Sequence, residues 1–216
     1  MVREFPELYL NVCPSDGTKR GNIENRQHGA CQTLWPGRGL LRGPSMRGVG
    51  NYSTFFSKAP QIGPRYNATI EAMRVVIDPK RVPAAVLDFV VGHLKSSFPQ
   101  FSWVGIYRLD GETLNLAAWK GPQATEHVAI PLGQGICGLA ARTRETVVVP
   151  DVSKDPRYLA CFPSTKSEIV VPIMADGTVF GEIDIDSDTP DAFSAHDRQF
   201  LEVVAEDLGR YLKVKG

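Results

Sequence analysis

The chain has 216 residues, of which 43% are hydrophobic and 22% are charged. This composition is typical of a globular protein that can form a hydrophobic core without disulfides or structural metal ions. Lysine and arginine number 24, as do aspartate and glutamate, so the formal net charge is zero. A general binder of nucleic acid or of an anionic membrane needs a basic excess, so we expect neither partner. No apolar run is long enough for a transmembrane helix, and four cysteines are too few for a disulfide scaffold. We therefore expect a cytoplasmic protein with reduced thiols.

Charge and glycine content divide the chain near residue 66. Residues 1–66 hold 9 Lys and Arg against 4 Asp and Glu, and they contain 9 of the 20 Gly and 6 of the 16 Pro. Glycine and proline at this density interrupt helices and strands. We therefore expect residues 1–66 to be a disordered extension and residues 67–216 to form one domain. Cys13 and Cys31 lie in the extension without a nearby ligand cluster, and we assign them no role.

Hydrophobic periodicity in the second part predicts alternating helices and strands. The expected elements, in chain order, are helices at 68–77 and 82–98, strands at 102–109, 113–119 and 128–130, a helix at 133–142, strands at 147–149, 168–174 and 178–186, and a helix from 193. The buried face of the second helix is expected to carry Val86, Phe89, Val90 and Leu94. Ser194 is predicted to cap the last helix, with Asp197 in its first turn.

Two Asp-Gly pairs, at 110–111 and 176–177, separate alternating runs and so predict β-hairpins. Hairpins favour an antiparallel sheet, and the element order predicts an α+β fold of about six strands with helices packed on one face. Residues 151–166 form a long connection between strands. Long connections inside a compact domain are usually functional, so we expect this loop region to cover a small enclosed pocket on the other face of the sheet.

Three segments resemble GAF domains: Phe101–Tyr107 (FSWVGIY), Ile130–Gly138 (IPLGQGICG) and Gly181–Ser187 (GEIDIDS). Within that superfamily, residues 67–213 are similar to the free methionine-(R)-sulfoxide reductases. The resemblance implies a GAF fold and the reduction of free L-methionine-(R)-sulfoxide to methionine. It implies thioredoxin or a similar dithiol as the electron donor, and no metal or organic cofactor. By resemblance alone, a homodimer paired through terminal helices is also expected.

Cys137 and Cys161 each lie in a match to a catalytic segment of that family. The resemblance assigns Cys161 the attack on the sulfoxide sulfur and Cys137 the resolving role, and the reverse assignment stays open. Thiolate attack leaves a sulfenic acid, which a second thiol converts to a disulfide. Many members carry a third cysteine where this chain has His127, so one resolving thiol is missing. A metal site made of His127, Cys137 and Cys161 lacks the tight spacing of zinc ligands.

Three carboxylates form the second candidate group. Asp184 and Asp186 alternate on one predicted strand, so they face the same side, and Glu168 begins the neighbouring strand. Strand interiors disfavour aspartate, and same-facing carboxylates repel unless a cation or shared protons relieve them. The ammonium group of a free amino acid would act as this cation. A carboxyl with a raised pKa would also protonate the leaving oxygen. The resemblance likewise assigns ligand binding to these positions.

Trp103 and Tyr107 lie four residues apart on the first predicted strand and share a face, which ordinary core packing also explains. In the resembling reductases, an aromatic at the Trp103 position encloses the methyl-sulfur end of the ligand, so we expect both residues to line the pocket. The main alternative function is a GAF module that senses a small molecule without chemistry. Such a module would keep the pocket but would not need both cysteines. Of a cyclic-nucleotide signature only Phe193 and Asp197 remain.

Overall fold

A computed structural model describes residues 55–58 and 60–215. The elements are α1 (Pro64–Val76), α2 (Pro83–Ser97), β1 (Trp103–Asp110), β2 (Thr113–Lys120), β3 (Ala129–Pro131), α3 (Gly135–Thr143), β4 (Val147–Val149), a single 3-10 turn η2 (Val152–Lys154), β5 (Ser167–Ala175), β6 (Thr178–Ser187) and α4 (Ala195–Lys215). Every helix and strand expected from the sequence is present. The 3-10 turn lies in the segment expected to be loop.

The six strands form one sheet in the order β3-β2-β1-β6-β5-β4, and each neighbouring pair is antiparallel. Both Asp-Gly pairs turn hairpins, as expected. In the β5–β6 turn, Asp176 and Gly177 have φ values of 47° and 76°, the left-handed conformation that a tight hairpin turn requires. The expected antiparallel α+β fold of six strands is therefore confirmed.

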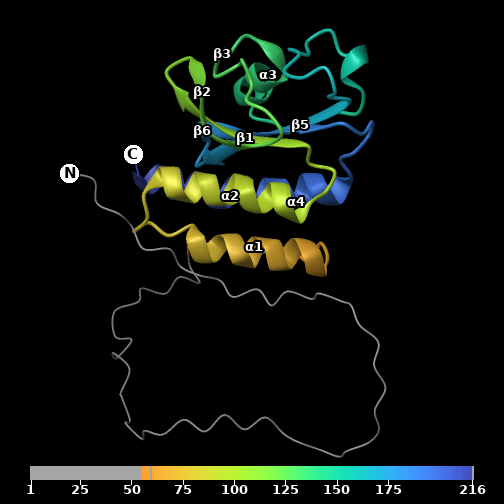
Figure 1. Ribbon diagram of the computed structural model, residues 1–216. Helices are drawn as coiled ribbons and strands as arrows, with labels where there is room; N and C mark the ends of the chain where they lie inside the picture. Colours follow the sequence, from red (N-terminus) through yellow and green to blue (C-terminus); the bar gives the residue numbers. More distant parts are fainter. Residues whose placement is uncertain (1–54, 59, 216) are drawn as a thin grey trace, which may run out of the picture. The chain divides into compact units, whose positions relative to one another are not determined.

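Helices and connections cover opposite faces of this sheet. Figure 1 shows α2 and α4 against one face with α1 outside them, while α3 and the connections from β2 to β5 lie on the other side. Alternate residues of β1 and β6 point into two separate clusters: Val104, Ile106, Ile183 and Ile185 pack toward the helices, whereas Trp103 and Tyr107 pack beneath α3. The second cluster is the face that carries the candidate site.

Helix α4 begins as the sequence predicts. The Ser194 hydroxyl accepts a hydrogen bond from the Asp197 amide (3.2 Å), and the Asp197 carboxylate accepts one from the Ser194 amide (2.9 Å). These reciprocal bonds form a capping box, which satisfies two amides that a helix start leaves free.

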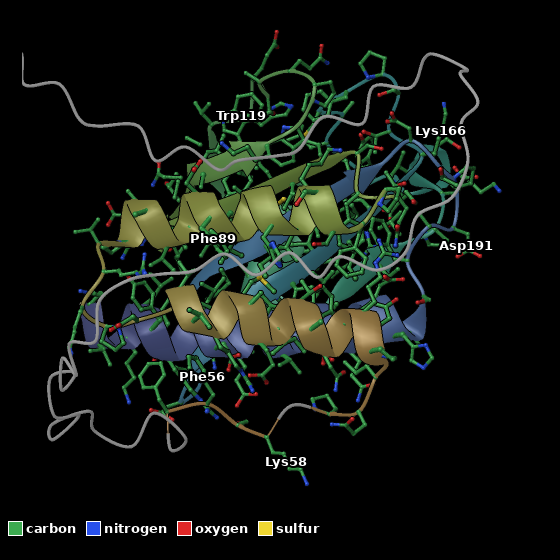
Figure 2. All side chains as sticks on the ribbon, turned by 60° about the horizontal axis from the view of Figure 1, so that its bottom comes forward. Phe56, Lys58, Phe89, Trp119, Lys166 and Asp191 are labelled. Carbon is green, nitrogen blue, oxygen red and sulfur yellow. The ribbon has the colours of Figure 1, made fainter. Side chains whose placement is uncertain are left out.

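The prediction for Phe89 is wrong. Its side chain is 37% exposed and stacks on His93, with 5.4 Å between ring centroids (Figure 2). The buried stripe of α2 also includes Leu87 and Val91, so its centre lies about a third of a turn from Phe89.

The packed domain begins earlier than residue 67. Phe55 and Phe56 pack against the helix-side cluster, and α1 starts at Pro64. The Arg74 guanidinium donates a hydrogen bond to the carbonyl of Ser57 (2.8 Å). Packed residues therefore precede the boundary expected at residue 67, and glycine and proline content gives no sign of these aromatic contacts. The disorder expected for residues 1–54, with Cys13 and Cys31, lies outside the described residues. No helix of the described part is long and apolar enough to cross a membrane.

Candidate functional site

Strand register brings the expected carboxylates and the aromatic residues to one face of the sheet. Asp186 on β6 lies opposite Trp103 on β1 and Glu168 on β5. Asp184, two residues earlier, lies opposite Gly105. Residues that face each other across antiparallel strands point to the same side, so all of these side chains meet beneath α3.

The Trp103 ring packs on the same face of the sheet as these carboxyl groups. A Cβ atom at Gly105 would lie 2.3 Å from the ring, and one at Gly121 would lie 2.2 Å from it, so both glycines are needed for its position. The ring packs against Phe162 (5.7 Å between centroids) and stacks on Trp119 (6.3 Å). Its buried Nε1 has no hydrogen-bond partner. The ring is therefore an apolar surface with one unpaired donor.

Tyr107 shares the face with Trp103, as expected, but its hydroxyl is already occupied. The hydroxyl donates to the carbonyl of His127 at 2.9 Å. Burial raises the pKa of Tyr107 far above its ordinary value, so the phenol stays neutral and remains a donor. Tyr107 thus anchors the segment before β3.

Both candidate cysteines border one small cavity and are free thiols. Cys137 lies in the first turn of α3 and is buried, and Cys161 lies half-buried in the segment between η2 and β5. Glu168 also lines this cavity, whose volume is about 10 Å³. That volume is about enough for one water molecule. The sequence predicts an enclosed ligand pocket, but the structure is closed further than expected because the Cys161 segment places Phe162 against Trp103.

Four carboxyl groups, one more than expected, are buried on this face. Glu168, Asp184 and Asp186 are at most 5% exposed, and so is Glu182. The following carboxylate oxygens have no hydrogen-bond partner: Glu168 Oε2, both of Glu182, Asp184 Oδ1 and both of Asp186. Sequence reasoning did not single out Glu182, although it is the first member of the alternating series 182, 184, 186.

Burial makes these groups hold protons near neutral pH. It raises the pKa of Asp186 to about 7, with a smaller contribution from the charge of Asp188, and raises the pKa of Glu182 to about 8. The pKa values of Glu168 and Asp184 are raised well above their usual range by burial and then by the neighbouring carboxylates. A cation placed among them would reverse this effect by favouring the charged forms.

The same environment keeps both thiols protonated. Burial raises the pKa of Cys161, the charges of Asp184, Asp186 and Glu168 raise it further, and the nearby Thr125 hydroxyl acts in the opposite direction. Burial, and then the charge of Asp184, raises the pKa of Cys137 well above its ordinary value. Because carboxylate charge contributes in both cases, a bound cation would lower both thiol pKa values.

One group of side chains in the described part has the proximity that a metal ion requires. The sulfur of Cys137 and carboxylate oxygens of Glu168 and Asp184 lie within 4.8 Å of one another. His127 is not part of it, since its Nε2 lies 3.2 Å from the carbonyl oxygen of Ala160. A larger hollow, about 990 Å³, lies elsewhere, between α1 and the stretch that carries Phe56 and Lys58 (Figure 2), and neither thiol lines it.

Comparisons with known proteins identify the family of this chain. The profile of the GAF domain family matches residues 84–212. GAF domain-containing protein A of Dictyostelium discoideum is 41% identical over 57% of this chain and 77% of its own length. Free methionine-R-sulfoxide reductase of Saccharomyces cerevisiae is 43% identical over 54% of this chain and 66% of its own.

A solved structure shows the same fold. Free methionine-R-sulfoxide reductase of Neisseria meningitidis, crystallised with its substrate, superposes with a TM-score of 0.63 and 34% identity. The match covers 74% of this chain and 94% of that one. The chain therefore belongs to the GAF domain family and is related to the free methionine-R-sulfoxide reductases.

Proposed function

We propose that this protein reduces free L-methionine-(R)-sulfoxide to L-methionine. The observation that carries the proposal is that Cys137 and Cys161, from separate elements, border one cavity together with Glu168. Two thiols on one cavity provide both a nucleophile and a resolving group. Relatives that bear the name of this activity support the same substrate.

The walls of the site suit the two ends of this substrate. Asp184 and Asp186 are buried without a cationic partner, so the ammonium group of a free amino acid would compensate their charge. Trp103 and Phe162 offer an apolar wall to the methyl-sulfur end. Because the cavity has a volume of only about 10 Å³, the segment that carries Cys161 must move outward before the ligand enters.

In the proposed cycle, the Cys161 thiolate attacks the sulfoxide sulfur. The substrate's sulfur–oxygen bond breaks, methionine leaves with its sulfur reduced, and the oxygen stays on Cys161 as a sulfenic acid. The Cys137 thiol then attacks that sulfur, which forms a disulfide and releases the oxygen as water. Thioredoxin or a similar dithiol supplies two electrons and two protons, which restore both thiols.

The buried carboxyls give this cycle a proton source. Glu182, with a pKa of about 8, is largely protonated at neutral pH, so it is suited to protonate the sulfoxide oxygen, whereas Asp186 is assigned to the ammonium group. The ammonium group would also weaken the carboxylate charge that keeps the Cys161 thiol protonated. Substrate binding is thus expected to activate its own nucleophile.

A non-catalytic sensor is the second candidate, and the raised thiol pKa values favour it, since an inert buried thiol has this property. A single-turnover experiment separates the two functions. The reduced chain is mixed with the (R)-sulfoxide without any dithiol, and methionine, free thiols and disulfides are quantified. We expect stoichiometric methionine and a Cys137–Cys161 disulfide.

Two variants assign the thiols in the same experiment. Cys161→Ser should release no methionine. Cys137→Ser should still release it once and leave a sulfenic acid on Cys161 that a dimedone probe traps. If instead Cys137→Ser releases no methionine and Cys161→Ser releases it once, the two cysteines have the opposite roles. Normal ligand binding without any methionine from the wild-type chain would support the sensor instead.

A further inference from the structure

The thiol of Cys137 is surrounded by carboxyl groups. Its sulfur and oxygens of Glu168 and Asp184 lie within 4.8 Å of one another, and all three residues are buried. Oε2 of Glu168 and Oδ1 of Asp184 lack any hydrogen-bond partner. The donor atoms of the cluster are therefore free to bind something other than a neighbouring side chain.

Glu182 is an independent indication of a ligand at this place. Its side chain is fully buried, its carboxyl group lies beside the Cys137 thiol, and neither of its oxygens has a hydrogen-bond partner other than that thiol. None of the ion pairs in the described part of the chain brings a lysine, arginine or histidine to these carboxyl groups. Buried carboxylates without a cation are unfavourable, so the cluster favours a positively charged ligand.

The donor set selects the chemical class of that cation. One thiolate sulfur with carboxylate oxygens suits a borderline or soft divalent ion such as Zn²⁺, Co²⁺ or Cd²⁺. Hard ions such as Mg²⁺ and Ca²⁺ prefer oxygen ligands alone. Three side chains with a fourth close by also match the coordination number that Zn²⁺ usually takes.

We propose that the reduced chain binds one thiophilic divalent cation through Cys137, Glu168 and Asp184, with Glu182 beside them. The cation displaces the thiol proton and the carboxyl protons, so binding weakens as pH falls. It also occupies the sulfur that the proposed reductase needs for resolution, and it acts as a reversible inhibitor rather than a cofactor. Oxidation of Cys137 to a disulfide removes the sulfur ligand and releases the ion.

Cobalt tests the proposal directly. The full chain is reduced with a phosphine, which avoids a competing dithiol, and is titrated with Co²⁺ without oxygen while thiolate-to-cobalt charge-transfer absorbance is recorded. We expect saturation at a single Co²⁺ per chain and reversal by Zn²⁺. Cys137→Ser should lose the band, whereas Cys161→Ser, the matched thiol control, should keep it.

Isosteric variants keep the test decisive if Cys137→Ser fails to fold. Glu168→Gln and Asp184→Asn should each weaken Co²⁺ binding by more than about tenfold, whereas Glu126→Gln on the exposed surface should leave it unchanged. Absence of the band in the wild-type chain, or its persistence in Cys137→Ser, would overturn the proposal. Neither result depends on sulfoxide turnover, so failure here is distinct from failure of the reductase function.

Discussion

Glu182, Asp184 and Asp186 place three carboxyl groups on one buried face of β6. A charged carboxylate at such a position loses its hydration. Within the described residues, no side-chain cation compensates for this loss. The folded chain therefore retains protons that the unfolded chain releases. Through these carboxyl groups, the free energy of unfolding depends on pH.

We expect Glu182→Gln to change how stability depends on pH. Burial raises the pKa of Glu182 from 4.5 to about 8, so between these values the folded state binds more protons than the unfolded state, and the free energy of unfolding falls as pH rises. Glutamine has the same shape and does not ionise. By pH 8 the variant should be more stable than the wild type by on the order of a few kcal/mol.

Urea unfolding of the reduced chain at about pH 5 and pH 8 checks this expectation. The exposed substitution Glu126→Gln is the matched control and should leave the pH dependence as it is. Equal slopes for wild type and Glu182→Gln would show that Glu182 ionises in the folded state as freely as in the unfolded state.

Alternation along residues 182–186 was sufficient to predict that Asp184 and Asp186 share a face, and Glu182 obeys the same rule. Their burial was not predictable in the same way. It depends on α3 and on the segment before β5, which reach this face only through tertiary packing. For the same reason the sequence indicated two cysteines but not that they border one cavity.

At the scale of elements, the segment from Asp155 to Thr165 is attached to its surroundings by few polar contacts. Its hydrogen bonds are mostly internal, such as those between Arg157 and Asp155. The contact between His127 Nε2 and the Ala160 carbonyl (3.2 Å) joins it to another segment. The His127 backbone is itself held by Tyr107 and Thr125. His127 therefore links the Cys161 segment to the sheet beneath it.

We expect His127→Ala to open the Cys161 segment more often. A hydrogen bond contributes about 1 kcal/mol, so its loss should raise the rate of Cys161 alkylation about fivefold while the melting temperature changes little. Peptide mapping after brief alkylation distinguishes Cys161 from the other thiols. His127→Gln retains a side-chain donor and should restore a slower rate. Equal alkylation of all three proteins would mean that other contacts close the segment.

The sequence predicted this segment as a pocket cover from its length alone. It did not predict that the enclosed cavity has a volume of only about 10 Å³, nor that His127 contacts the cover, because contacts between distant loops leave no periodic signal. Helices and hairpins were predictable, since amphipathic spacing and Asp-Gly turns are local properties.

In the whole molecule, the first described residues and the first turn of α1 belong to the packed domain. Tyr66 stacks on Phe98 (5.5 Å between centroids), and its hydroxyl donates to Asp197 (3.0 Å). The Arg210 guanidinium donates to the carbonyl of Phe55 (2.9 Å). These contacts join the start of the domain to α4.

A chain that begins at residue 67 should consequently be less stable than one that begins at residue 55. It lacks the aromatic side chains of Phe55, Phe56 and Tyr66, and apolar burial of this size contributes on the order of a few kcal/mol. Thermal unfolding of the two truncated chains measures the difference. Equal melting temperatures would return the domain boundary to residue 67.

The proposed function requires that the two thiols reduce one epimer of a free amino acid. The most direct measurement incubates the purified chain with free methionine-(R)-sulfoxide and dithiothreitol, with the (S) epimer in parallel, and quantifies methionine. We expect methionine from the (R) epimer only. If the folded protein with reduced thiols yields no methionine from either epimer, the proposed function is wrong.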